Sequence, residues 1–97
     1  MERQEILNTI IKIIKDNLYI ISYNTLISES TKISDLQLDE LDCIEIEIEF
    51  EIQFDLPKES CDSFISKSET IKDVIDKISD LLNNGTSRNI KYNRTSI

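Results

Sequence analysis

The chain has 97 residues, of which 39% are hydrophobic and 31% are charged, and its net charge is −8 at neutral pH. This length allows one small domain with a single core, and the composition is typical of a globular rather than a disordered protein. Because the sequence contains no histidine, it excludes an ordinary zinc site and the Ser-His and Cys-His nucleophile pairs. We therefore expect a protein that is not an enzyme, with no catalytic and no metal-binding residue.

Residues 3 to 18 place apolar side chains at helical spacings of three and four, which predicts the first helix. These side chains are Ile6, Leu7, Ile10, Ile11, Ile13, Ile14 and Leu18. Lys12 and Lys15 interrupt the run, so it differs from the apolar core of a signal peptide, and no stretch of the sequence is long enough to span a bilayer. We expect the protein to be cytoplasmic and monomeric.

From residue 19 to residue 38 the apolar period loosens, and Ser, Asn and Thr alternate irregularly with isolated Ile and Leu. This pattern predicts a long connection that is pinned to the core by single apolar side chains. Of the two cysteines, Cys43 and Cys61, neither has a metal-ligand spacing. We expect both to be buried or half-buried free thiols.

Residues 44 to 54 support two conflicting predictions. Apolar and polar residues alternate strictly, which by periodicity alone predicts a half-buried strand. Glu is a poor strand former, however, no partner strand is evident, and Asp39 with Asp42 three residues later makes a good helix start. We therefore predict a second helix that begins near Asp39 and ends at Phe54.

On a helix, with about 100° per residue, this alternation separates into two apolar stripes. One stripe contains Ile46, Phe50 and Phe54, and the other contains Leu41, Ile44, Ile48 and Ile52. Glu45 and Glu49 flank the second stripe, while Glu47 and Glu51 lie between the two. Since one stripe is enough for a core, the second is either another buried face or a surface for a partner, and its acidic edge suits docking on a basic, apolar surface.

The last helix is predicted over residues 71 to 82, because Thr70 and Asp73 have the spacing of a capping pair and an apolar face follows them. Between residues 57 and 68 there is room for one short helix, over residues 60 to 65. We expect one domain over residues 1–85. The tail, residues 86–97, is basic through Arg88, Lys91 and Arg94; it either folds back on the acidic residues or extends into solvent, and we expect it to be flexible.

The negative charge is concentrated in residues 35 to 56, which carry nine carboxylates and no Lys or Arg. Such a patch repels nucleic acid and anionic membranes and accelerates association with basic protein surfaces. The alternative interpretation is a solvated helix face that keeps a small protein in solution. We expect basic protein partners, no nucleic-acid partner and no membrane span.

The octapeptide Asp35-Leu36-Gln37-Leu38-Asp39-Glu40-Leu41-Asp42 resembles the signature of acyl carrier proteins, in which an Asp-Ser-Leu triplet opens the second helix. Ile44-Glu45 and Phe54-Asp55 extend the likeness. The resemblance covers about residues 3 to 82. It implies an all-α, four-helix bundle with a long first loop and a short third helix, whose acidic second helix is recognised by basic surfaces of carrier-recognising enzymes.

The resemblance also assigns site residues. The partner-binding positions would be Asp39, Glu40, Leu41, Ile44, Glu45, Ile48, Glu49 and Ile52, and the positions at the core or acyl pocket would be Ile46, Glu47, Phe50 and Phe54. Glu47 departs from the family, which has an apolar residue near the pocket. Because burying a carboxylate is costly, we expect either that Glu47 swings out to solvent or that the pocket is small or absent.

Glu40 occupies the position of the serine that carries 4′-phosphopantetheine in the family. A carboxylate cannot form the phosphodiester, and neither Ser34 nor Cys43 is placed as an evident substitute, so we expect no cofactor. Glu40 is either a favourable acid at a helix start or an electrostatic mimic of the modified serine.

The sequence thus predicts an acyl-carrier-like interaction module that docks its second helix on basic proteins. The alternative is a functional acyl or aminoacyl carrier of fatty-acid or related biosynthesis, carrying 4′-phosphopantetheine, in which Glu40 was introduced artificially or is bypassed. A third reading, an acidic adaptor or nucleic-acid mimic, rests on charge alone and does not explain the octapeptide.

Overall fold

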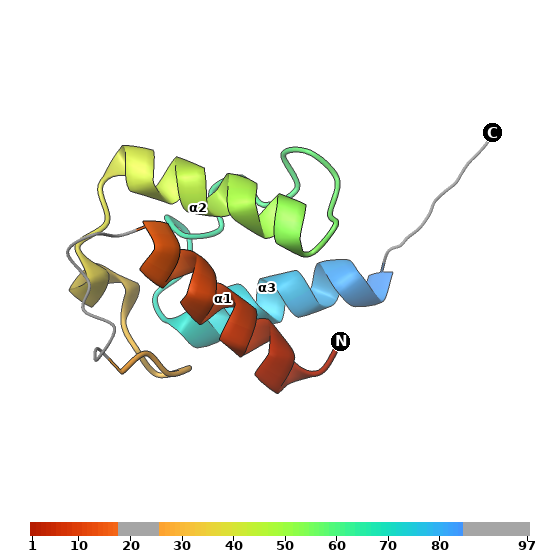
Figure 1. Cartoon of the computed structure of the whole chain (residues 1–97), viewed down its shortest axis with the longest axis horizontal. Coiled ribbons are helices and arrows are strands. Elements are labelled where there is room, and N and C mark those ends of the chain that lie inside the picture. Colours follow the sequence, from red (N-terminus) through yellow and green to blue (C-terminus); the bar gives the residue numbers. More distant parts are fainter. Residues whose placement is uncertain (18–25, 85–97) are drawn as a thin grey trace.

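The structure, a computed structural model, describes residues 1–17 and 26–84. In chain order these residues form the helix α1 (Arg3–Asn17), a short 3-10 helix η1 (Ile33–Leu36), α2 (Glu40–Gln53) and α3 (Ile71–Asn84). α1 packs against both α2 and α3. Figure 1 shows α2 along the top of the molecule, with the segment that contains η1 at the end where α2 begins. The predicted all-α class is confirmed.

The predicted four-helix bundle is wrong, because the described residues contain three α-helices. The short third helix expected over residues 60 to 65 is absent there, and residues 58–67 form a series of turns. Within this segment Glu59 has φ of 70° and Ser63 has φ of 65°. A non-glycine residue in this left-handed region cannot continue a right-handed helix, so Ser63 interrupts the stretch that periodicity assigned to one.

The ends of α2 follow from local sequence. The Asp39 carboxylate accepts a hydrogen bond from the backbone N–H of Asp42 at 2.7 Å, and the Asp42 carboxylate accepts one from the backbone N–H of Asp39 at 3.2 Å. This reciprocal capping box satisfies two N–H groups that a helix start leaves without partners. At the other end Asp55 turns left-handed, with φ of 54°, and the N–H of Leu56 donates to the carbonyl of Glu51 at 2.8 Å. The choice of helix over strand for this segment is therefore confirmed.

α3 begins on partners from a distant segment. The backbone N–H groups of Ile71 and Lys72 donate to the carbonyls of Thr31 and Glu29, at 3.0 and 2.8 Å. The Asp73 carboxylate accepts the N–H groups of residues 69 and 70 at 2.9 and 3.2 Å, and these two bonds lower the pKa of Asp73. The start of α3 is thus satisfied both by its own acid and by the loop before η1.

The core is built mainly from Ile on one face of each helix. Its fully buried side chains, each less than 2% exposed, include Ile6, Ile10 and Ile14 of α1, Ile46 and Phe50 of α2, and Ile71, Val74, Ile75 and Ile78 of α3. From the connection before α2, Ile27, Ile33 and Leu36 are also buried. Ile27 and Ile33 are single apolar anchors of the kind expected for a long connection, whereas Leu26, expected to be another, is 94% exposed.

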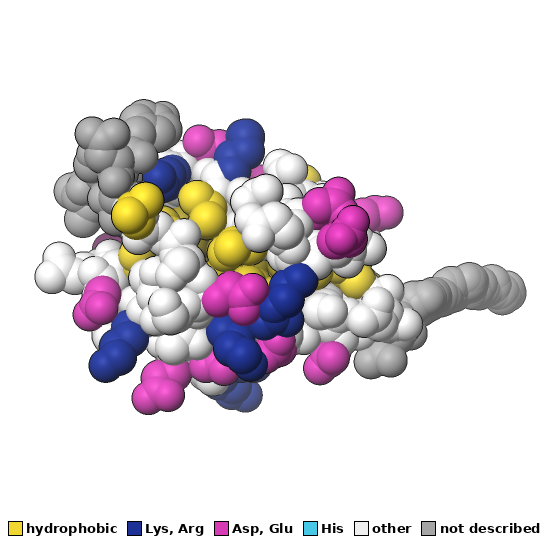
Figure 2. All heavy atoms as spheres, turned by 90° about the horizontal axis from the view of Figure 1, so that it is seen from below, with side chains coloured by type: hydrophobic (Ala, Val, Ile, Leu, Met, Phe, Trp, Pro, Cys, Tyr) yellow, Lys and Arg dark blue, Asp and Glu magenta, His cyan; other side chains and the backbone are white. Residues whose placement is uncertain are grey.

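Charge is distributed unevenly over the molecule. Figure 2 views it from below, which is the side away from α2 in Figure 1, and there Lys and Arg side chains lie among Asp and Glu, with hydrophobic patches between them. Residues 35–56, which include all of α2, contain neither Lys nor Arg. On the face seen in Figure 2, Lys and Arg therefore offset the charge of the Asp and Glu among them, whereas α2 contains no Lys or Arg.

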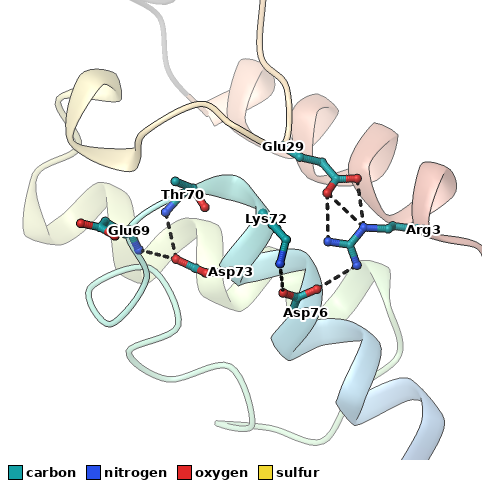
Figure 3. A network of polar contacts seen from close by, with 7 residues as sticks. All are labelled: Arg3, Glu29, Glu69, Thr70, Lys72, Asp73 and Asp76. Carbon is teal, nitrogen blue, oxygen red and sulfur yellow. Dashed lines mark hydrogen bonds and ion pairs between the residues drawn. The ribbon is translucent and has the colours of Figure 1, made fainter.

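A polar network connects α1, the loop before η1 and α3 (Figure 3). The Arg3 guanidinium contacts the carboxylate of Glu29 at 2.9 Å and that of Asp76 at 2.8 Å, and Lys72 contacts Asp76 at 3.0 Å. Hydrogen bonds from Lys72 and Arg3 lower the pKa of Asp76. Because each partner is about two-fifths or more exposed, the ion pairs orient the three elements and add little to stability.

Two expectations fall outside the part of the chain that the structure describes. They are the course of residues 18–25 within the long connection and the flexibility of the basic tail, residues 86–97. Within the described ranges, no helix combines the length and apolar character needed to cross a membrane.

The opposite faces of α2 can be compared with a pair of identical truncations. Ile46 is 0% exposed and Ile48 is 50% exposed. We expect Ile46→Ala to lower the free energy of unfolding by about 2–5 kcal/mol, since it leaves a cavity, and Ile48→Ala to change it by no more than about 0.5 kcal/mol. Urea denaturation followed by circular dichroism measures both, and equal losses would contradict the orientation of α2.

Candidate functional site

The solvent face of α2 carries a row of four large aliphatic side chains. Leu41, Ile44, Ile48 and Ile52 are 64%, 46%, 50% and 64% exposed. Their spacing of three and four residues aligns them along one side of the helix, opposite the buried Ile46, Phe50 and Phe54. We call these four residues the α2 row. A contiguous exposed apolar row is unusual on a monomer and is typical of surfaces that bind a partner.

Carboxylates border the α2 row on one side. Glu45 is exposed, and Glu49 is half-buried and accepts a hydrogen bond from the Gln53 amide at 3.3 Å. At the start of the helix lie Asp39, whose side chain caps α2, and Glu40, its first residue, both exposed. The partner-binding residues expected from sequence are therefore brought together on one surface, and a carboxylate at Glu40 adjoins the free N–H end of the helix.

Glu47 and Glu51 border the row on its other side, and both are buried. They are 7% and 9% exposed. Glu47 accepts a hydrogen bond from the backbone N–H of Ile65 at 3.1 Å, and Glu51 accepts one from the backbone N–H of Cys61 at 3.0 Å. Of the two expectations for Glu47, that it swings out to solvent is wrong, because the turns at 58–67 supply an N–H donor that keeps its carboxylate inside.

Burial raises the pKa of Glu47 above its usual range, and the neighbouring carboxylates of Asp62 and Glu51 raise it further. Backbone N–H groups of Ile65 and Ser63 oppose this rise by stabilising the charged form. The sequence analysis placed Glu47 and Glu51 between the two apolar stripes, but it predicted neither the burial of Glu51 nor the backbone N–H donors of the two carboxylates. The available indication was that Glu47 and Glu51 are four residues apart at the edge of the core stripe, where a buried carboxylate needs a hydrogen-bond donor.

A surface groove of about 990 Å³ runs between α2, the residues around η1 and the turns at 58–68. Ile44 and Ile48 of the α2 row form part of its wall, so the groove and the row are continuous. Among the described residues that line it, the charged ones are Asp39, Glu40, Glu47, Glu51, Glu59 and Asp62, with Lys58 as the single cation. Its other walls include hydroxyl and aliphatic side chains, and the charge balance suits a cationic, partly apolar ligand.

The surroundings of Cys43, one of the two residues near Glu40 with a possible attachment atom, do not activate its thiol. Both cysteines are free thiols. Cys43 is half-buried on the groove wall, and its burial, with the acids around it, raises the pKa of the thiol. Ser34 is exposed on the same wall. Among residues 1–17 and 26–84, no cluster of His, Cys, Asp or Glu has a geometry that could hold a metal ion.

Comparison of the chain with protein-family models, with curated proteins and with solved structures gives no match. The candidate site consists of the α2 row, the exposed acids beside it and the groove that continues it.

The buried carboxylate of Glu47 predicts a pH dependence of stability. Because its pKa in the folded protein is raised above the usual 4.5, the folded state binds more protons than the unfolded state at pH values between the two. This contribution is complete below the usual value and is lost as pH rises through the folded one. We expect the wild type to lose free energy of unfolding relative to Glu47→Gln as pH rises above about 4.5.

Urea denaturation at a series of pH values measures this difference, and Glu45→Gln, on the exposed flank of the same helix, is the matched control. Parallel pH profiles of the wild type and Glu47→Gln would show that burial does not affect this carboxylate.

Proposed function

We propose that this protein is a non-enzymatic, acyl-carrier-like interaction module that docks the α2 row on an apolar, basic surface of a carrier-recognising enzyme. The observation that carries the proposal is the row itself: four aliphatic side chains, 46–64% exposed, on a helix without a single Lys or Arg. Leaving this much apolar surface in water is unfavourable, and a partner that covers it recovers that free energy.

Charge determines which partner the surface prefers. Asp39, Glu40 and Glu45 are exposed beside the row, so a partner with Lys or Arg around an apolar patch associates faster and in one orientation. The same charges disfavour nucleic acid and anionic membranes. We propose basic proteins as the partners, in the cytoplasm, with the module acting as a monomer.

The acyl-carrier resemblance supports the class of partner, because the octapeptide extends into the first turn of α2 and includes Leu41, the first residue of the α2 row. Glu40 is the first residue of that helix and has no hydroxyl to which phosphopantetheine could be attached. The module therefore keeps the docking side chains and lacks the anchor. It would act as a scaffold, a regulator or a competitor of true carriers.

Binding to an immobilised phosphopantetheinyl transferase tests the docking surface. We expect Glu45→Lys combined with Ile48→Ala to weaken binding at least about tenfold, because it removes a charge and an apolar contact from the centre of the surface. The matched control is Glu5→Lys combined with Leu26→Ala, since both residues are exposed and neither belongs to α2. Equal affinities for the two double variants would contradict the proposal.

A second experiment separates the module from the alternative, a working carrier. The wild type and Glu40→Ser are incubated with a phosphopantetheinyl transferase and coenzyme A, and their intact masses are measured. We expect one added phosphopantetheine on Glu40→Ser and none on the wild type, because only the variant has a hydroxyl at this helix start. Modification of the wild type would establish the carrier, with Ser34 on the groove wall the first residue to examine. Absence of modification on both would contradict the carrier resemblance.

A further inference from the structure

Residues 57–68 connect α2 to α3 without forming a helix. Their backbone hydrogen bonds are short-range, as in the bonds from Ser60 to Pro57 and from Phe64 to Cys61, at 3.1 Å each. Glu59 and Ser63 are left-handed, which is unfavourable for residues with a side chain and must be offset by other contacts. Its internal hydrogen bonds therefore stabilise its conformation less than those of a helix would.

Two hydrogen bonds to α2 supply much of the stabilisation that the segment lacks within itself. The backbone N–H groups of Cys61 and Ile65, four residues apart, donate to the carboxylates of Glu51 and Glu47, which are also four residues apart. The matching spacing aligns the segment with the helix over one turn. At its far end the Lys77 ammonium donates to the carbonyl of Lys67 at 3.3 Å and to the Ser68 hydroxyl at 2.8 Å.

Apolar side chains lie beneath these polar contacts. Cys61 is 0% exposed and Ile65 is 4% exposed, and both belong to the same core as Ile46 and Phe50 of α2. The segment therefore covers one side of the core, while α1 packs against both other helices.

The two carboxylates lose water when the segment is closed and regain it when the segment opens. The desolvation of a buried carboxylate offsets much of what its hydrogen bond contributes. Opening of residues 57–68 therefore costs less free energy than separation of the helices, which would expose the apolar faces of all three.

We propose that residues 57–68 form a cover over the core that opens as a unit, separately from global unfolding, and that Glu47 and Glu51 latch it shut. Opening exposes Cys61, Ile65 and the edge of the core-facing stripe of α2, which Glu47 and Glu51 separate from the α2 row. The inference depends on the contacts within this chain alone and does not require the proposed docking function.

Cys61 reports the state of the cover. Burial raises the pKa of its thiol to about 12, and with no exposed surface it cannot react while the cover is closed. In a Cys43→Ser background it is the only cysteine of the chain. Its rate of reaction with an aromatic disulfide reagent is measured at increasing urea concentrations below the unfolding transition. We expect reaction through opening with a much weaker urea dependence than global unfolding, because little surface is exposed.

The latch is tested with two pairs of variants on the same helix. Glu47→Ala and Glu51→Ala each remove an acceptor and leave an N–H group without a partner in the closed state, so we expect the Cys61 rate to rise at least about tenfold. Glu45→Ala and Glu49→Ala are matched controls on the opposite flank, and we expect changes below about twofold. Glu47→Gln keeps an oxygen acceptor at the same place, and we expect it to keep Cys61 protected.

Global stability is measured on every variant by circular dichroism. The proposal is overturned if the Cys61 rate of the Cys43→Ser protein follows the full urea dependence of unfolding. It is also overturned if the latch variants accelerate the reaction only in proportion to their loss of global stability. If Glu47→Ala or Glu51→Ala does not fold, the urea dependence of the Cys61 rate in the Cys43→Ser protein still decides whether the cover opens separately from global unfolding.

Discussion

The rotation of α2 about its own axis is the constraint on which the remaining features depend. It is set from two sides: Ile46 and Phe50 are buried against the core, and Glu47 and Glu51 accept backbone N–H groups from the turns at 58–67. With these two stripes fixed, Leu41, Ile44, Ile48 and Ile52 have no position other than the solvent face. A rotation that buried the row would expose the core stripe and leave two carboxylates inside without donors, so the exposed row is a consequence of satisfying the rest of the helix.

This arrangement separates two properties that a carrier combines. In the proposed function, recognition depends on side chains along the length of α2, whereas in a carrier the attachment of a prosthetic group depends on one hydroxyl at the helix start. Glu40 has no hydroxyl and is the first residue of a helix that Asp39 and Asp42 cap, so it is compatible with the α2 row on the solvent face. The turns at 58–67, in place of a further helix, alter the wall of the groove and leave the α2 row unaffected. The proposed function therefore rests on the α2 row and the exposed acids beside it.

Buried acids are an uncommon way to attach a connecting segment in so small a domain. An apolar contact at the same place would avoid desolvating two carboxylates, and Glu47 shows the cost in its raised pKa. In return the carboxylates supply acceptors to a stretch of backbone whose left-handed residues prevent it from pairing internally as a helix. Stability is thus unevenly distributed over the molecule. The Ile-rich faces of the three described α-helices form its most stable part, and the cover at 57–68 is attached more weakly.

The sequence by itself determined the three helices and the division of α2 into its faces, because each depends on information within a few residues. The spacing of apolar side chains fixes which face is buried, and the Asp39–Asp42 pair fixes where α2 begins. The tertiary structure alone decided the conformation of residues 57–68, the burial of Glu47 and the pairing of the start of α3 with residues 29–31. Glu47 and Ile65 are separated by 18 residues, and Thr31 and Ile71 by more. Whether a carboxylate turns outward or stays inside depends on a backbone N–H donor that only the folded chain brings close to it. Local periodicity does not predict where that donor lies.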